Sequence, residues 1–388
     1  MENNVVISTV GTSLLTHQIN RPQENEATKQ DESNWFYQLR EVTNFKVDEV
    51  EKSYPEVAEI IQKLKGRAEN KLKESDKKTI RRISAELNGI YGFYNNEPEK
   101  GNKDVHWLIA TNTAQGIVTA EMIREFLVDK GITNTNIYQS NSNFSTASTD
   151  EFSQGIAEII PWIQELTEGY KSQAKIVFNL VGGFKAVQGY MNTVGMFYAH
   201  EIIYIFEGSN ELIKIPRLPV DIKLLEVKPH KVPLAMMSQG EVLTSWEEAQ
   251  KVPKDWVFVL EKEMTLSTWG QLIYQQCKNK FLSEDKPLKF PKIEYERSFL
   301  DDYQDKPKYE RIILQENLAR LACILNMNKD GISAVKQDGI FRLRRYSGKH
   351  KDLDHFDLPK DRRVSCLTSG NTLQLRHYGE HNYVNDNP

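Results

Sequence analysis

The sequence predicts an α/β protein with more than one domain. Strand-like apolar runs alternate with helical patterns through the first half of the chain, this alternation stops after residue 210, and the last part shows one helix followed by short strands. Alternation is typical of a parallel, doubly wound sheet, whereas a helix followed by a meander is typical of an α+β domain. With 388 residues, 39% of them hydrophobic and 27% charged, the chain is long enough for two or three domains.

The first part of the chain supplies four candidate strands, each a short apolar run rich in β-branched residues. They are NVVISTV (4–10), VHWLIAT (105–111), KIVFNLV (175–181) and EIIYIF (201–206), with helical patterns at 115–131, 150–170 and 184–199. Residues 20–104 interrupt the alternation, and their charged, helix-periodic middle predicts a helical insertion packed on the sheet edge. We therefore expect a first domain over residues 1–215.

The second half of the chain predicts two smaller parts. Prolines at 216, 219, 229 and 233 mark the exit from the first domain. Residues 216–285 predict a small middle module or linker with the strand candidate DWVFVLE and the helix TWGQLIYQQCKNKFL. Residues 286–388 predict an α+β domain, with the strand KIEYERSF, the helix KYERIILQENLARLACIL and the strands FRLRRY, RRVSCLT and NTLQLRHY.

Composition excludes several classes of protein. The formal net charge of −4 argues against indiscriminate nucleic-acid binding, although residues 286–388 hold 19 Lys and Arg against 15 Asp and Glu, and four of the eight histidines. Cys277, Cys323 and Cys366 stand far apart, so neither a disulfide framework nor a zinc site is predicted. No apolar run is long enough to span a membrane and no signal peptide is recognisable, so we expect a cytoplasmic protein without a membrane partner.

Small and hydroxyl residues follow three of the predicted strands. VGTSLLT (10–16), ATNTAQG (110–116) and NLVGGFK (179–185) would leave the carboxyl ends of parallel strands, where loops meet in one crevice and helix N-termini attract anions. Lys185 adds a cation. These loops predict a pocket for a phosphate-bearing ligand, without a GxGxxG or P-loop fingerprint. A structural alternative stays open, in which Gly182 and Gly183 only end a strand and Ser13 only caps a helix.

GTSLLT near the N-terminus, together with NLVGGFK, resembles the CARF domain of CRISPR-associated effectors, the sensor of cyclic oligoadenylates. The resemblance covers residues 1–215, although the insertion is larger than the family pattern requires. It implies a Rossmann-like homodimer that binds cyclic tetra-adenylate, an allosteric activator, across its two-fold axis. By the family motif, the pocket residues would be Gly11, Thr12, Ser13, Asn112, Gln115, Asn179, Gly182, Gly183, Phe184 and Lys185.

The same resemblance implies a second activity of the N-terminal domain. Some CARF domains slowly cleave their own ligand, with the ribose 2′-OH attacking the adjacent phosphate while a serine and a lysine stabilise the developing charge. Ser13 and Lys185 match these roles in a ring nuclease. Binding of the ligand without cleavage is the alternative.

The segment after residue 340 combines arginine and histidine with short strands. Metal-independent RNA cleavage needs a base for the 2′-OH proton, an acid for the 5′-oxygen and cations around the phosphorane. Imidazole titrates near neutral pH and guanidinium binds phosphate through paired N–H groups, so the segment holds the necessary groups. The alternative is a solvated basic face, with Arg342 and Arg344 turned to water opposite Phe341 and Leu343.

Residues 290–388 resemble the RelE-type toxins, ribosome-associated endonucleases that cleave mRNA. The similar features are KIEYERSF, the long helix, the arginine of RRVSCL and the closing HYGEHNYV, whereas DHFDL stands where some members carry a lysine-rich strand. The resemblance implies Arg363 as a phosphate-binding cation, His381 as general acid or base, and Tyr383 as a base-stacking or orienting group. Arg345, Lys349 and His355 are further candidates, and the identity of the base stays open.

Together these features predict a homodimer in which cyclic tetra-adenylate activates a ribosome-dependent endoribonuclease. The expected partners are mRNA and the ribosome, and neither DNA nor a cofactor or metal is expected. Arg345 and His350 also have the R-x4-6-H spacing of HEPN ribonucleases, common partners of CARF sensors, but they stand among strand-like runs and not in a helical domain. A regulator that binds nucleic acid without cutting it is a further alternative, although residues 216–285 show no convincing helix-turn-helix.

Overall fold

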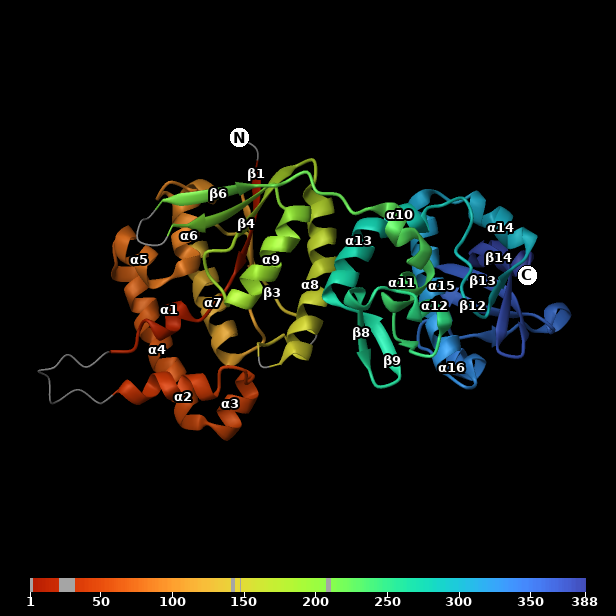
Figure 1. The fold of residues 1–388 in the computed structure, drawn as a ribbon, viewed down its shortest axis with the longest axis horizontal. Coiled ribbons are helices and arrows are strands. Elements are labelled where there is room, and N and C mark those ends of the chain that lie inside the picture. The colour runs from red at the N-terminus through yellow and green to blue at the C-terminus, as the bar shows by residue number, and fades with distance from the viewer. Residues whose placement is uncertain (1–2, 21–31, 141–143, 147, 207–210) are drawn as a thin grey trace, which may run out of the picture. The chain divides into compact units, whose positions relative to one another are not determined.

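The computed structural model describes residues 3–20, 32–140, 144–146, 148–206 and 211–388. The chain divides into two compact units, Met1–Val220 and Asp221–Pro388 (Figure 1). The division lies close to the boundary predicted after residue 215. The protein is of the mixed α/β class, with parallel strand pairs in both of its larger sheets.

The N-terminal unit contains a six-stranded sheet with the order β3-β2-β1-β4-β5-β6. The first five strands in this order pair in parallel, and β6 pairs antiparallel to β5 at the edge. The predicted strands are all present, while β3 and β6 were not predicted. The bounds are β1 Asn3–Thr9, β2 Val105–Ile109, β3 Thr135–Tyr138, β4 Ala174–Asn179, β5 Glu201–Ile205 and β6 Leu212–Pro216.

The central strands are continuous apolar runs because both of their faces are covered, as is usual in parallel sheets. Val6, Val177 and Ile203 come from three adjacent strands and pack against Phe93, a residue of the insertion. Helices α7, α8 and α9 correspond to the three helical patterns predicted from periodicity, whereas the short α1 was not predicted. Their bounds are α1 Ser13–Thr16, α7 Ala114–Asp129, α8 Thr149–Tyr170 and α9 Lys185–Tyr198.

In the described part of the insertion, residues 32–104, the chain forms five α-helices, and Figure 1 shows α2 to α5 grouped at one side of the N-terminal unit. In α4 the buried positions Val57, Ile60, Ile61, Leu64, Ala68 and Leu72 recur every three or four residues, so one apolar face meets the core. Ser84 caps the last helix, α6, by accepting a hydrogen bond from the Leu87 N–H at 3.2 Å. The bounds are α2 Trp35–Glu41, α3 Val47–Ser53, α4 Pro55–Glu74, α5 Lys77–Ile83 and α6 Ala85–Phe93.

The C-terminal unit has one hydrophobic core, to which the predicted middle module and the predicted α+β domain both contribute. Met236 and Tyr274 from the former pack in the same cluster as Leu318 and Phe356 from the latter. The middle segment therefore shares its core with residues 286–388. Its elements are α10 Leu224–Val227, α11 Lys231–Met237, β7 Val242–Leu243, α12 Glu247–Gln250, β8 Val257–Leu260, β9 Glu263–Leu266 and α13 Thr268–Leu282.

A five-stranded sheet with the order β10-β14-β13-β12-β11 completes this unit. The pair β10 and β14 is parallel and the other pairs are antiparallel. The bounds are β10 Ile293–Tyr295, α14 Arg297–Gln304, α15 Lys308–Met327, α16 Gly331–Gln337, β11 Arg344–Arg345, β12 Asp354–Leu358, β13 Arg362–Ser369, β14 Thr372–Glu380 and α17 His381–Asp386.

Two predicted strands of the C-terminal unit are much shorter than expected. KIEYERSF yields only β10, because α14 begins at Arg297 and buries Phe299 and Tyr303 one helical turn apart. FRLRRY yields only the two residues of β11, because Arg342 has a φ of 48° and so takes the chain out of the extended conformation. Among the described helices, none is long and apolar enough to cross a membrane.

His106 predicts a pH dependence of stability in the N-terminal unit. Its side chain is fully buried, its Nε2 lies 2.9 Å from the Tyr94 hydroxyl, and burial lowers its pKa to about 4 despite the opposing charge of Asp104. His106 binds a proton less tightly in the folded form than in the unfolded chain. The contribution of neutral His106 to the free energy of unfolding is therefore complete above pH 6.5 and is lost as the pH falls towards 4. We expect a loss of about 2 kcal/mol between pH 7.5 and pH 5.

The measurement is amide hydrogen exchange of β1 and β2 in the full chain at both pH values. His106→Gln should remove most of this pH dependence, whereas His350→Gln, at an exposed turn, should leave it unchanged. An unaltered pH dependence in His106→Gln would contradict the assignment.

Candidate functional site

The three predicted ligand loops begin at one edge of the six-stranded sheet. Strands β2, β1 and β4 are adjacent and parallel, so residues 110–116, 10–16 and 179–185 all follow carboxyl ends of neighbouring strands. The Val10 N–H donates to the Ile109 carbonyl at 2.9 Å and continues the pairing of β1 with β2 to its last residue. The structure thus brings the three segments together.

Glycines let two of these loops approach each other closely. A Cβ atom on Gly11 would lie 3.2 Å from the N and Cα atoms of Gly183, and Gly183 has a φ of +104°. The Thr9 hydroxyl donates to the Gly182 carbonyl at 2.5 Å and joins the end of β1 to the same loop. A side chain at either glycine would separate the loops, so these glycines do more than end a strand.

Glu86, the second residue of α6, lies beneath these loops and was not predicted from the sequence. Its side chain is fully buried, and its carboxylate accepts hydrogen bonds from the Gly11 N–H and the Ser84 hydroxyl, each at 2.8 Å. A Cβ atom on Gly182 would lie 2.2 Å from Glu86 Oε1. The Gly11 N–H is therefore already bonded, and the insertion supplies a structural part of the loop cluster.

Three predicted ligand residues use their side-chain amides within the protein. The buried Asn179 donates through Nδ2 to the Ser8 hydroxyl at 3.1 Å and to the Glu86 carbonyl at 3.0 Å. The buried Gln115 donates to the Leu39 carbonyl at 2.7 Å and so holds α2 against α7. The half-buried Asn112 donates to the Ser140 carbonyl at 2.8 Å.

Most of the remaining predicted residues are more accessible. Thr12, Gly183 and Phe184 are half-buried, and Lys185 is exposed at the first residue of α9 without an ion-pair partner in the described part of the chain. The first N–H groups of a helix have no partner within the helix, and at α9 the N-cap residue Phe184 does not cap them with its side chain. The Ser13 hydroxyl oxygen is buried, has no hydrogen-bond partner among the described residues, and stands at the start of α1, not at its N-cap.

In the C-terminal unit, one carboxylate connects two arginines and a histidine. Arg363 donates to Asp357 Oδ1 through Nε at 3.0 Å and through Nη2 at 2.8 Å, Arg344 donates to Oδ2, and His381 Nε2 lies 3.4 Å from Oδ1. We call these four residues the Asp357 cluster. Burial disfavours the charged carboxylate, but the hydrogen bonds and charges of the two arginines outweigh it and hold the pKa of Asp357 below its usual value.

A second carboxylate, Asp302 of α14, lies close to the other predicted residue of α17. The Tyr383 hydroxyl donates to Asp302 Oδ1 at 2.6 Å, and His377 Nδ1 and the Tyr378 N–H lie 2.9 and 3.0 Å from Oδ2. The hydrogen bond to Asp302 raises the pKa of Tyr383 to about 12. Asp302 thereby ties α14 to β14 and α17.

His355 lies next to the Asp357 cluster, but its imidazole is enclosed by the protein and forms no ion pair with a carboxylate among the described residues. Its side chain is buried, its Nδ1 has no hydrogen-bond partner among the described residues, and its ring centroid is 4.3 Å from that of Tyr346. Burial and the charges of Arg363 and Arg344 lower its pKa to about 4. A neutral, enclosed imidazole does not suit proton donation at pH 7.

The other candidates lie apart from the cluster. Arg345 pairs with Asp354 at 3.2 Å, and because side chains alternate along a strand, it projects from the sheet face opposite to Arg344. Lys349 and His350 are exposed in the 3-10 turn Gly348–His350. The structure does not join Arg345, Lys349 or His350 to Arg363.

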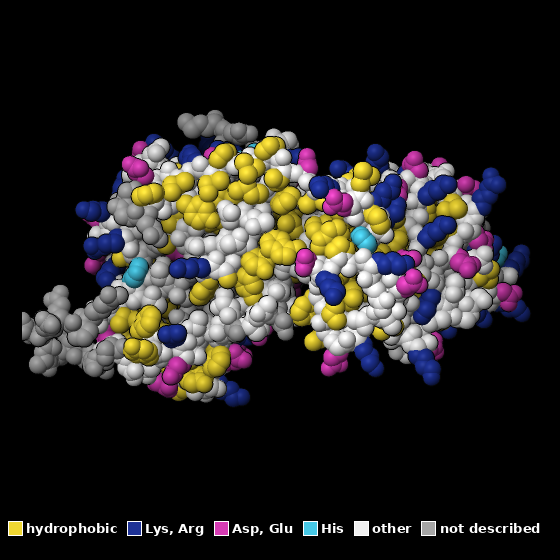
Figure 2. All heavy atoms as spheres, in the orientation of Figure 1, with side chains coloured by type: hydrophobic (Ala, Val, Ile, Leu, Met, Phe, Trp, Pro, Cys, Tyr) yellow, Lys and Arg dark blue, Asp and Glu magenta, His cyan; other side chains and the backbone are white. Residues whose placement is uncertain are grey.

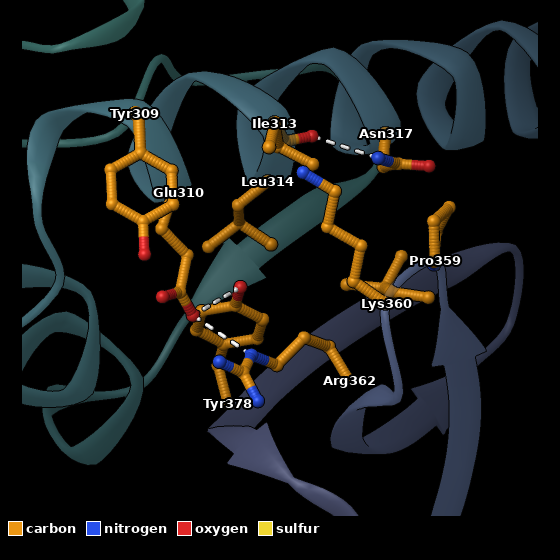
Figure 3. Close-up of a pocket in the computed structure, with 10 residues that line it drawn as sticks. Tyr309, Glu310, Ile313, Leu314, Asn317, Pro359, Lys360, Arg362 and Tyr378 are labelled. Atoms are coloured by element: carbon orange, nitrogen blue, oxygen red, sulfur yellow. Dashed lines mark hydrogen bonds and ion pairs between the residues drawn. The ribbon is translucent and has the colours of Figure 1, made fainter.

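A pocket opens beside β13, where Arg362 is one of the residues that line it (Figure 3). Because side chains alternate along a strand, Arg363 projects from the opposite face. The pocket lies between α15 and the turn after β12, where Tyr309, Ile313, Pro359 and Lys360 line it. At its base the Glu310 carboxylate accepts hydrogen bonds from Arg362 Nε and from the Tyr378 hydroxyl, both at 3.0 Å. None of the predicted site residues lines it.

One comparison with known protein families concerns the N-terminal unit. Residues 81–218 match the family model described as CRISPR-associated protein (Cas_APE2256). The match supports a CRISPR-associated protein. It includes Glu86 and the loops 110–116 and 179–185, but neither residues 11–13 nor the C-terminal unit.

The residues that sequence reasoning missed are mostly the acidic partners. The sequence DLPKDRR is typical of a hairpin, and its tight turn would place Asp357 opposite Arg363. The observed register pairs these two residues, so Asp357 could have been predicted. No local signal connected Glu86 with Gly11, or Asp302 with His377, because each pair is far apart in the chain. In the described residues, no group of three or more His, Cys, Asp or Glu is arranged to hold a metal ion.

The space around Gly182 yields a test of the loop cluster. Gly182→Ala would force a methyl group onto the buried Glu86 carboxylate, so we expect the N-terminal unit to lose about 2 kcal/mol or more of stability. Urea unfolding followed by hydrogen exchange of α6 and α9 measures it. Gly189→Ala is the matched control, because a Cβ atom there meets nothing within 4 Å and alanine favours the helix. Equal stability of the two variants would show that the loops do not depend on this packing.

Proposed function

We propose that the chain is an effector of CRISPR-associated defence, with a sensing N-terminal unit and an RNA-cleaving C-terminal unit. In this proposal the N-terminal unit is a CARF sensor of cyclic tetra-adenylate, and the C-terminal unit is a RelE-like, metal-independent and ribosome-dependent endoribonuclease that cleaves mRNA. The family match supports the CRISPR association. The observation that carries the nuclease proposal is the placement of Arg363 and His381 around Asp357 on one face of a sheet.

The Asp357 cluster supplies the groups that RNA cleavage requires. Two guanidiniums hold the two oxygens of a carboxylate, a geometry that also suits two phosphate oxygens. His381 is the general acid or base of this proposal, and its imidazole is oriented by Asp357. Tyr383, with 41% of its surface exposed, is available to stack on or orient a base.

The resting arrangement also suggests what activation changes. Asp357 now satisfies both arginines, so an incoming phosphate must compete with it. A ligand of the N-terminal unit activates the nuclease only to the extent that it binds the competent arrangement more tightly than the resting one. The proposed coupling is therefore a shift between an Asp357-bound and a phosphate-accessible state of Arg344 and Arg363.

The sensor proposal uses the groups of the loop cluster that have no partner among the described residues. Lys185 and the start of α9 supply positive charge for a phosphate, and the Ser13 hydroxyl has a free hydrogen-bonding capacity. Dimerisation needs an apolar surface, and Figure 2 shows hydrophobic side chains gathered over β6 and α9. Ile213 of β6 and the nearby Phe206 are 38% and 58% exposed. These residues support a homodimer in which each subunit supplies half of the ligand site.

The nuclease proposal is tested in a cell-free translation extract with added cyclic tetra-adenylate. We expect the wild type to cleave translated mRNA and to leave naked RNA intact, and His381→Ala to lower the cleavage rate by roughly 100-fold or more. His350→Ala should cleave at the wild-type rate. If His350→Ala is inactive and His381→Ala is active, the HEPN alternative holds instead, and binding of RNA without any cleavage would favour a regulator.

The sensor proposal is tested by calorimetric titration with cyclic tetra-adenylate. Lys185→Ala should weaken binding by roughly 10-fold, because it removes a charged contact to phosphate. Lys52→Ala, which changes an exposed lysine of the insertion helix α3, is the control and should bind like the wild type.

The ring-nuclease part of the proposal has its own test. Ser13→Ala should bind the ligand but degrade it more slowly over hours, and an absence of ligand degradation by the wild type would contradict this part. No heat with any cyclic oligoadenylate would contradict the sensor itself.

A further inference from the structure

His377 of β14 is, like His381, a histidine of the C-terminal unit that lies against a carboxylate. Its Nδ1 lies 2.9 Å from Asp302 Oδ2, while the other oxygen of Asp302 accepts the Tyr383 hydroxyl at 2.6 Å. An ionised carboxylate only accepts hydrogen bonds, so Nδ1 of His377 is the donor, and in the neutral imidazole Nε2 is then the nitrogen with the free lone pair. Nε2 has no hydrogen-bond partner in the described residues, and 21% of the side chain is exposed.

His377 lies on the same face of the sheet as the Asp357 cluster. In the register of β13 and β14, Arg363 is opposite Gly379 and Ser365 is opposite His377. Opposite residues share a face, and diagonal neighbours on one face are about 7 to 8 Å apart. Arg363 and His377 are such diagonal neighbours.

Gly379 leaves the space between them open for Tyr383. A Cβ atom on Gly379 would lie 2.7 Å from Cδ1 of the Tyr383 ring. The ring can therefore lie over Gly379, and its centroid is 6.0 Å from that of His377. The face thus presents His377, Tyr383 and Arg363 side by side, followed by Asp357 and His381.

We propose that His377 is the general base of the C-terminal site and that Asp302 is its positioning residue. This inference rests on the proposed ribonuclease function and assigns the base that the sequence left open. Nε2 of His377 takes the proton of the ribose 2′-OH, and the 2′-oxygen attacks the adjacent phosphorus. The bond from phosphorus to the 5′-oxygen breaks, and His381 gives a proton to that oxygen. The products are a 2′,3′-cyclic phosphate and a 5′-hydroxyl end.

The division of roles follows from which nitrogen each carboxylate contacts. Asp302 engages Nδ1 of His377 and leaves Nε2 as an acceptor, which is what a base needs. His381 instead places Nε2 itself 3.4 Å from Asp357 and 3.6 Å from Asp361, contacts that a proton-bearing nitrogen makes. Arg363 lies between the two histidines, where the phosphate charge develops.

A merely structural role for the Asp302 tie predicts different behaviour. In that case, changing His377 would lower stability or weaken the docking of α17, and kcat would follow only through the folded fraction. His377→Asn separates the two roles, because its amide can still donate to Asp302 while it lacks the second nitrogen. Asp302→Asn keeps a carbonyl acceptor but permits the other tautomer of His377.

The test measures the cleavage of mRNA on programmed ribosomes by the full chain in the presence of cyclic tetra-adenylate. The variants compared are His377→Asn, Asp302→Asn and His381→Ala, and the control is His350→Asn. We expect His377→Asn to lower kcat by roughly 100-fold or more with KM within about threefold, and to remove the ascending limb of the pH profile. Asp302→Asn should shift this limb and lower kcat less. The urea midpoint reports folding, and His377→Gln replaces a variant that fails to fold.

A substrate with sulfur in place of the 5′-bridging oxygen makes the assignment sharper. Sulfur leaves without protonation, so this substrate should restore most of the activity of His381→Ala and none of the activity of His377→Asn. Wild-type kcat and pH profile in His377→Asn would overturn the inference, as would restoration of His377→Asn by the sulfur substrate. If the wild type cleaves no RNA, the proposed nuclease function fails and this inference fails with it, whereas an active wild type with an active His377→Asn refutes the inference alone.

Discussion

A buried carboxylate holds the N-terminal loop cluster in place. Glu86 accepts from the backbone of Gly11 and occupies the space that only the absence of a side chain at Gly182 leaves open. Its own carbonyl accepts from Asn179, which in turn reaches Ser8 of β1. The loops after β1 and β4 and the first turn of α6 therefore form one packed assembly. A buried carboxylate without such partners would be strongly unfavourable, so the assembly is specific to this geometry.

The C-terminal unit uses carboxylates in a related way, at a more exposed place. Asp357 brings together side chains from β11, β13 and α17, and Asp302 joins α14 to β14 and α17. Both sets meet on the sheet face that α15 does not cover. Because charge-assisted hydrogen bonds are directional, these carboxylates also decide which nitrogen of each histidine is available for chemistry.

The regular elements were largely predictable from local patterns, and the partners of the site residues were not. Periodicity located β1, β2, β4 and β5 and the helices α7, α8 and α9, since a buried strand or an amphipathic helix shows in a few consecutive residues. It missed β3 and β6, the two edge strands of the sheet, and it extended FRLRRY into a strand that the backbone at Arg342 interrupts. Asn179 and Gln115 have the composition of ligand residues, but their amides bond within the protein.

By itself, the sequence determined the mixed α/β class, the positions of most strands and helices and the residue types available at their ends, because these depend on neighbours along the chain. Only the tertiary structure decided which polar groups are already satisfied. Glu86 meets Gly11, and Asp302 meets His377, across long separations in the chain. Such contacts arise from the packing of whole elements, which brings distant residues together at a cost in chain entropy that no local pattern records.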